Sequence, residues 1–172
     1  ARPYSCRRRA APAGPPRRSA LRRPISALAQ SNPLPSDPLS GECAERGMEL
    51  VAAARRRDSR RFATAFLSLL GLGAGLTPSG DDLLAGALAA AWWLPGNRSS
   101  LFLRKESAKL IARHGEKTTP VSRHFLSAAA EGVFCEFVYR FLEALSAVDA
   151  KLIAYWTEEI RGWGATSGTW PT

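Results

Sequence analysis

Apolar residues recur along the chain at the spacing of α-helices, and no segment shows the sustained alternation of a β-strand. The clearest case follows Asp58, where Phe62, Phe66, Leu69 and Leu70 are spaced 4, 3 and 1 residues apart and mark one buried helix face. Asp58 is a residue type that caps helix N-termini well. The pattern as a whole predicts a mainly α fold, a single array of about seven helices with Gly-rich loops.

The most apolar helix should begin near Ser79 and stop before Pro95. Ser79, followed three residues later by Asp82, matches the pattern of a capping box. From there to Trp93 nearly every residue is apolar, and many are alanine or glycine. We therefore expect this helix to be the buried centre of the domain, approached closely by its neighbours.

The other helices are predicted from caps and helix breakers. One begins at the cap Ser40 and runs to about Arg57, with apolar positions at Cys43, Met48, Leu50 and Val51. Another begins at Ser99 or Ser100 and ends near His114, with Leu101, Leu103, Leu110 and Ile111 facing inward. Three more are expected from Thr119-Pro120 to about Gly132, from Phe134 to about Val148, and from the cap Asp149 to near Gly162.

Composition separates the first part of the chain from the rest. The net charge of the 172 residues is +9, but residues 1–23 hold eight arginines and no acid, so the remainder is nearly neutral. Residues 1–38 also contain eight of the twelve prolines and few apolar residues to bury. We predict a disordered Arg/Pro-rich tail over residues 1–38 and a helical domain over residues 39–172. This distribution of charge argues against a nucleic-acid partner.

The same composition argues against a membrane protein and against an oxidising compartment. The longest apolar run, residues 83–94, is shorter than the roughly 20 residues that cross a bilayer, and no signal-peptide pattern opens the chain. The three cysteines, Cys6, Cys43 and Cys135, are widely spaced and form no CxxC motif. We therefore expect no membrane partner and a cytoplasmic location.

The stretch with the most unusual composition is Gly71–Asp82, which lies between two predicted helices. Glycine allows a backbone to turn sharply and to approach a ligand closely, and a helix N-terminus that follows it presents free N–H groups to an anion. The candidate donors are the amides of Gly73, Gly75, Ser79 and Gly80 and the hydroxyls of Thr77 and Ser79. We hypothesise a site for the phosphate or carboxylate of a small anionic metabolite. The alternative is a turn that only caps a helix.

Asp81 and Asp82 close this stretch and admit three roles. They could bind Mg²⁺, one of them could be a catalytic general base, or they could complement the dipole of the helix that they begin. Adjacent residues of a helix diverge by about 100°, so the two carboxylates do not easily reach one atom. We expect one to reach the site and the other to serve as a cap. No other metal site is predicted, and no cofactor is certain.

Two further hydroxyl-rich segments could contribute to the same site. Thr119 and Ser122 begin a predicted helix, where a plain N-terminal cap is an equally good interpretation. Residues 162–168 repeat the loop in shorter form and would add three ligand-binding residues: Thr166, Ser167 and Gly168.

The run from Leu70 to Gly86, with Thr118, Thr119 and Ser122 and the Ala128-to-Gly132 run, resembles the AllH family. Residues 164–168 look like the start of that family's third block, which then departs from the pattern, so the domain reads as truncated at its end. The resemblance covers roughly residues 40–168. It implies a subunit of the oxamate carbamoyltransferase of allantoin and purine nitrogen catabolism, which would have other enzyme subunits as partners. The alternatives are a non-catalytic helical subunit that completes the active site of another chain, and an inactive fragment.

Overall fold

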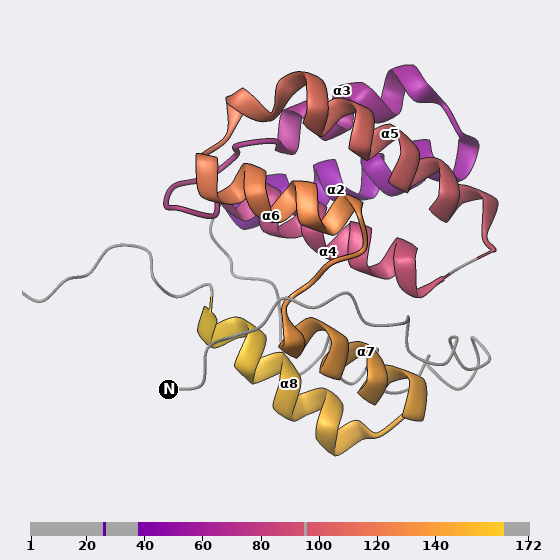
Figure 1. The fold of residues 1–172 in the computed structure, drawn as a ribbon, viewed down its shortest axis with the longest axis vertical. Coiled ribbons are helices and arrows are strands. Elements are labelled where there is room, and N and C mark those ends of the chain that lie inside the picture. The colour runs from indigo at the N-terminus through magenta and orange to yellow at the C-terminus, as the bar shows by residue number, and fades with distance from the viewer. Residues whose placement is uncertain (1–25, 27–37, 95, 164–172) are drawn as a thin grey trace, which may run out of the picture. The chain divides into compact units, whose positions relative to one another are not determined.

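The computed structural model describes residues 26, 38–94 and 96–163, and these residues form helices and turns without a strand ladder (Figure 1). The prediction of a mainly α fold is therefore confirmed. The predicted tail, apart from residues 26 and 38, and the final hydroxyl-rich segment lie outside the described residues. From residue 38 to residue 163 the described chain forms seven α-helices and one 3₁₀ turn: α2 (Pro38–Arg56), α3 (Ser59–Leu69), α4 (Ser79–Trp93), α5 (Arg98–His114), η1 (Gly115–Lys117), α6 (Pro120–Ala130), α7 (Glu136–Ala147) and α8 (Ala150–Trp163).

The described helices belong to two compact units: α2 to α6 lie in the first, residues 35–132, and α7 and α8 lie in the second, which includes residues 133–163. In the first unit, α3 forms as its sequence predicts. The Asp58 side chain accepts a hydrogen bond from the Arg61 amide at 3.0 Å, and Phe62, Phe66 and Leu69 are fully buried. The ring of Phe62 meets that of Phe102 on α5 edge-on, at 5.5 Å between centroids.

Helix α2 begins at Pro38, so Ser40 lies within the helix and is not its N-terminal cap. Of the four apolar positions predicted for it, Cys43 and Leu50 are buried, but Met48 is 68% exposed and Val51 is 48% exposed. The packed face of α2 instead uses small residues, Ala53 and Ala54, that let α3 and α4 come close. Hydrophobic spacing alone therefore misassigned two positions of this helix.

Helix α4 is the centre of the first unit and contacts α2, α3, α5 and α6 (Figure 1). Leu84 and Leu88 are buried, but Asp82, Gly86 and Ala90 form an exposed stripe, so the helix is not enclosed on all sides as predicted. The predicted capping box is also absent. Pro78 occupies the N-cap position without a side-chain hydrogen bond, because Ser79 already belongs to the helix.

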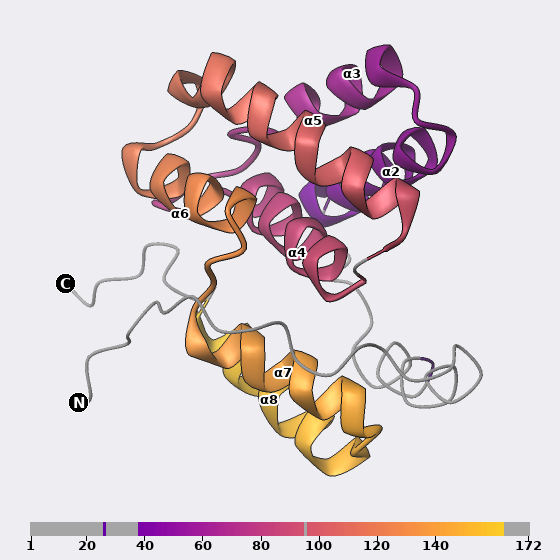
Figure 2. The same ribbon diagram turned by 45° about the vertical axis from the view of Figure 1, so that its right-hand side comes forward.

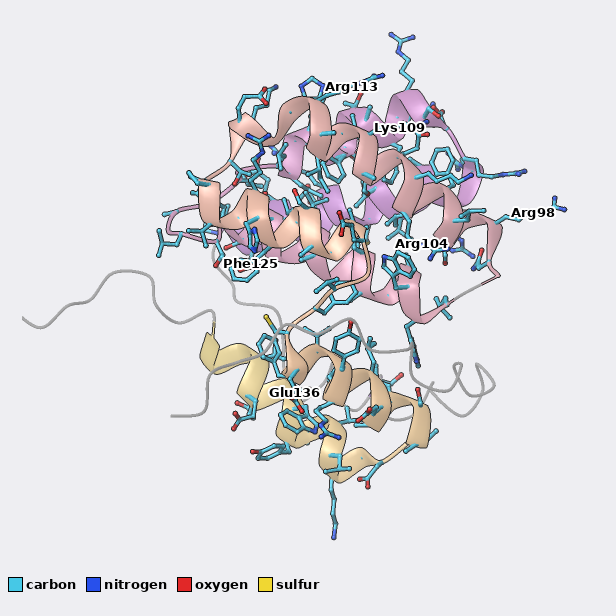
Figure 3. The ribbon with its side chains drawn as sticks, in the orientation of Figure 1. Arg98, Arg104, Lys109, Arg113, Phe125 and Glu136 are labelled. Atoms are coloured by element: carbon cyan, nitrogen blue, oxygen red, sulfur yellow. The ribbon has the colours of Figure 1, made fainter. Side chains whose placement is uncertain are left out.

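Near the end of α4, the Trp92 side chain contacts both α5 and α6. The Trp92 indole donates a hydrogen bond to the Ala129 carbonyl at 3.1 Å, and the Arg104 guanidinium stacks over the ring at 4.1 Å (Figure 3). Gly132 leaves room for the ring, because a Cβ there would come within 3.0 Å of it.

The ends of these two helices only partly match prediction. Asn97 caps α5, in place of the predicted Ser99 or Ser100, by accepting a hydrogen bond from the Ser99 amide. Leu101 is 45% exposed and does not face inward as expected. Thr119 caps α6 as predicted.

The second unit is a hairpin of α7 and α8 (Figure 2). Asp149 caps α8 as predicted, since its carboxylate accepts hydrogen bonds from the Lys151 and Leu152 amides at 3.0 Å. Leu142 and Ile153 are buried between the two helices. Among the described residues, no helix is both long enough and apolar enough to span a bilayer.

Candidate functional site

The Gly71–Asp82 segment joins α3 to α4 and includes the first turn of α4. Its inner half, formed by Gly71, Leu72, Gly80 and Asp81, is closely packed. The Leu72 amide bonds the Leu69 carbonyl, and the Gly80 amide bonds the Leu72 carbonyl, both at 2.9 Å. A Cβ on Gly80 would lie 2.1 Å from the Leu69 carbonyl oxygen, and one on Gly71 would lie 2.5 Å from that of Lys117. Glycine is therefore required at both positions because no side-chain atom fits against these carbonyl groups.

Asp81 holds this inner half in place. It is 1% exposed, and its carboxylate accepts hydrogen bonds from the Gly71 amide at 2.8 Å, the Ser122 hydroxyl at 2.6 Å and the Thr118 hydroxyl. Three donors replace the water that the charge loses on burial. Asp81 therefore joins the end of α3, the segment after η1 and the first turn of α6 to the start of α4.

Thr119 adds a second connection between the loop and α6. Its hydroxyl donates to the Leu76 carbonyl at 2.5 Å and accepts a hydrogen bond from the Ser122 amide at 3.0 Å. Thr119 and Ser122 thus lie beside the Gly-rich loop, as one of their two predicted roles requires. Both side chains are engaged in hydrogen bonds within the protein, which supports the role of a helix cap that also fixes the loop.

The outer half of the loop is open to solvent. Gly73, Gly75 and Ser79 are exposed and Thr77 is half-buried. Gly73 and Gly75 have φ angles of +113° and +98°, a left-handed conformation that favours glycine. Among the described residues, no acceptor is found for the amides of Gly73, Gly75, Thr77 and Ser79. The amide of Gly80, also predicted to bind an anion, is instead used by the Leu72 carbonyl.

Asp82 borders this open half and differs from its neighbour Asp81. It is exposed as a residue, yet the protein removes part of the water from its carboxyl group. Partial burial raises the pKa of Asp82 from 3.8 to about 6, and the adjacent Asp81 carboxylate adds to the rise. The carboxyl group of Asp82 is therefore half-protonated near pH 6.

The sequence-predicted site residues thus fall into three groups. Gly73, Gly75, Thr77, Ser79 and Asp82 lie together on the open part of the loop, and Gly80, Asp81, Thr119 and Ser122 form its support. Thr166, Ser167 and Gly168 lie outside the described residues, so their contribution stays a prediction. Sequence reasoning did not assign roles to Thr118 and Gly71, which both bond Asp81. The adjacent hydroxyls of Thr118 and Thr119 before a helix were the available signal.

No group of three or more His, Cys, Asp or Glu side chains that could hold a metal ion is found in the described part of the chain. The two adjacent carboxylates do not act together, because Asp81 is buried and bound by three donors while Asp82 is exposed. Of the two residues, only Asp82 has a carboxylate at the solvent-exposed part of the loop.

Throughout the described residues these observations define a helical protein with a Gly-rich loop built onto the start of its central helix. The family model described as oxamate carbamoyltransferase subunit AllH matches residues 69–170, and the chain belongs to this family. The match begins at the last residue of α3, later than the sequence resemblance suggested, and includes the whole loop, Asp81, Thr118 and Ser122. No solved structure matches the chain.

Proposed function

We propose that this carbamoyltransferase subunit binds the phosphate or carboxylate group of a small substrate at the outer half of the Gly71–Asp82 loop. In this proposal the reaction is that of an oxamate carbamoyltransferase in allantoin and purine nitrogen catabolism. The observation that carries the proposal is a set of amides, those of Gly73, Gly75 and Ser79, that belong to exposed residues, have no acceptor among the described residues and lie within the segment that the family model matches.

The chemistry of carbamoyl transfer agrees with such a site. The carbamoyl group moves between an oxygen of phosphate and the amide nitrogen of oxamate, and both reactants carry negative charge that must be held in position. Stabilising the charge on the departing phosphate is the main electrostatic task. Amide groups and hydroxyls suit both tasks, since they donate hydrogen bonds without needing to change protonation state.

Ser79 is the best-placed donor for this role. It is the first residue of α4, its amide has no acceptor among the described residues, and it lies at the positive end of the helix dipole. Gly73 and Gly75 bring two more amides into the same exposed segment. Asp82 opposes an anion while it is charged, so protonation of its carboxyl group favours binding.

A second candidate function is a binding subunit without chemistry of its own, whose loop completes the active site of another subunit. The engagement of Asp81 favours it, because three donors occupy one of the two carboxylates predicted to be catalytic. The open part of the loop then keeps Asp82 as its one carboxylate among the described residues. Turnover by the purified chain without partner subunits would exclude this second function.

Calorimetric titration of oxamate, phosphate and carbamoyl phosphate into the full chain tests the proposal. Ser79→Pro removes the amide donor at the first position of α4, where a helix tolerates proline, and Pro78 already has the extended ψ of 144° that precedes proline. We expect it to weaken anion binding by about tenfold or more. Ser79→Ala removes only the hydroxyl and should cost about threefold at most. Equal affinity of the wild type and Ser79→Pro, with unchanged helical content, would overturn the proposal.

A further inference from the structure

Helix α2 has two apolar faces, and the fold of the first unit uses one of them. The inner face carries Cys43, Leu50 and Ala53, which are buried. The outer face carries Ala44, Met48, Val51 and Arg55, spaced 4, 3 and 4 residues apart, which is the spacing of a coiled-coil seam. Met48 and Val51 are 68% and 48% exposed. Exposure of large apolar side chains on such a seam indicates a surface that packs against another helix.

This outer face forms one side of an open groove of about 540 Å³. Helix α4 supplies the other side through Leu83 and Ala87, beside α2 (Figure 2). Gly47 lies where the two helices meet, since a Cβ there would be 3.1 Å from the Leu83 side chain. The residues of α2 along the groove are Ala44, Gly47, Met48, Val51, Ala52 and Arg55.

These six residues are complementary to themselves when α2 is reversed. Two antiparallel copies centred between residues 49 and 50 place Met48 opposite Val51, Gly47 opposite Ala52 and Ala44 opposite Arg55. The two large apolar side chains therefore meet each other, two small residues meet each other, and the one charged side chain meets a small alanine at the end of the seam. An interface across a two-fold axis has this property, because each contact between two positions occurs twice.

The charges of α2 follow the same symmetry. Before the proposed axis, α2 carries Glu42, Glu45 and Glu49 against one arginine, Arg46, and its last two residues are Arg55 and Arg56. Glu42 pairs with Arg46 within the helix, while Glu45 and Arg55 are exposed. In the antiparallel arrangement, Glu45 of one copy lies beside Arg55 of the other. The preceding segment of the same chain is a poor occupant next to Arg55, because residues 1–37 are Arg-rich and contain one acid, Asp37.

We propose that a second copy of this chain docks on the groove, with the two α2 helices antiparallel across a two-fold axis. Each α2 then lies between α2 and α4 of the other copy and covers Met48 and Val51. The proposal does not depend on the function of the Gly-rich loop.

Sedimentation velocity of the full chain over a range of concentrations tests this association. We expect a dimer for the wild type, and a dimer dissociation constant raised about tenfold or more by Met48→Glu, since the substitution places two charges in one interface. Leu101→Glu is the matched control, because Leu101 is an exposed apolar residue of the same unit that does not line the groove. A monomer at every concentration, or a dimer that Met48→Glu does not weaken, would overturn the proposal.

A charge exchange then distinguishes a second copy from any other occupant. Glu45→Arg and Arg55→Glu should each weaken the dimer, because like charges meet twice across the axis. The double variant should regain the dimer, and so should an equimolar mixture of the two single variants, which restores both opposite-charge contacts. Single variants that weaken the dimer without recovery in the double variant or the mixture would exclude antiparallel pairing of α2.

Discussion

The inner and outer halves of the α3–α4 loop are both rich in glycine, but their glycines serve different purposes. Gly80 is buried, and because it has no side chain the Leu69 carbonyl group can pack directly against its backbone. Gly75 is exposed, and a Cβ there would meet nothing within 4 Å, so only its left-handed backbone favours glycine. A Gly-rich segment therefore does not have one explanation. Gly73 combines the two cases, since it is exposed but a Cβ there would lie 2.9 Å from the Ser79 amide nitrogen.

The hydrogen bonds divide the loop in the same way. The inner amides donate to Asp81 or to backbone carbonyl groups such as those of Leu69 and Leu72, whereas the outer amides have no acceptor among the described residues. We call the hydrogen-bonded inner half, with Thr119 and Ser122, the support, and the solvent-exposed outer half from Gly73 to Ser79 the rim. Substitutions in the support should cost stability, and substitutions in the rim should change ligand binding.

The largest effect is expected at Gly80. Gly80→Ala places a methyl group 2.1 Å from the Leu69 carbonyl oxygen, so the backbone must move. We expect a loss of about 4 kcal/mol in the free energy of unfolding, or failure to fold, measured by urea denaturation. Gly86→Ala is the matched control on the exposed side of α4, where nothing lies within 4 Å. It should raise stability by about 0.5–1 kcal/mol, and equal stability of the two variants would contradict this account of the inner half.

Removal of the Asp81 carboxylate should have the next largest effect. Asp81→Ala leaves the Gly71 amide and the Thr118 and Ser122 hydroxyls without their acceptor. We expect a loss of about 3 kcal/mol in the free energy of unfolding. Thr77→Ala, in the rim of the same loop, should change it by less than about 0.5 kcal/mol. Similar losses in both variants, measured by the same denaturation, would remove the distinction between support and rim.

The smallest effect concerns Asp82 and ligand affinity. Because its pKa is raised to about 6, the carboxyl group is charged at pH 7.5 and mostly neutral at pH 5. Oxamate keeps its single charge over this range, so its affinity should rise about threefold to tenfold as the pH falls through 6. Asp82→Asn should bind tightly at both values. Titration calorimetry measures the change in affinity. A pH-independent affinity in the wild type would show that the Asp82 carboxylate does not lie near the bound ligand.

The same shift affects folding. The raised pKa means that ionisation of Asp82 is less favourable in the folded protein than in the unfolded chain. The charged carboxylate therefore lowers the free energy of unfolding, and this loss develops as the pH rises from about 4 through 6. Asp82→Asn should therefore stabilise the protein above pH 6 and leave it unchanged near pH 4. Since the residue is exposed, the gain should be less than about 1 kcal/mol.

Local signals in the sequence predicted most of the helices. Asp58 and Thr119 were recognisable as caps, and the spacing of Phe62 and Phe66 identified the buried face of α3. The prediction of buried residues failed where the sequence pattern of a helix fits more than one buried face. Helix α2 has two apolar faces, and spacing cannot tell which one lies inside, so Met48 and Val51 could not be distinguished from core residues.

The candidate site was predictable as a location but not as a mechanism of support. The Gly-rich run and the hydroxyls were visible in the sequence, and a family resemblance joined them. The role of Asp81 was not predictable, because its donors lie 10, 37 and 41 residues away along the chain. Ser79 and Asp82 satisfied the local rule for a capping box, but Ser79 lies inside the helix and Asp82 remains exposed.

The distant donors of Asp81 also affect the order in which the protein can form during synthesis. When a ribosome has made α3 and α4 but not yet residue 118, the Asp81 carboxylate lacks two of its three donors, Thr118 and Ser122. The loop can then take its final shape only when α6 docks against α4, because contacts between distant segments form after the intervening chain is available. A nascent or partly unfolded chain would contain every residue of the rim before the rim has its folded shape.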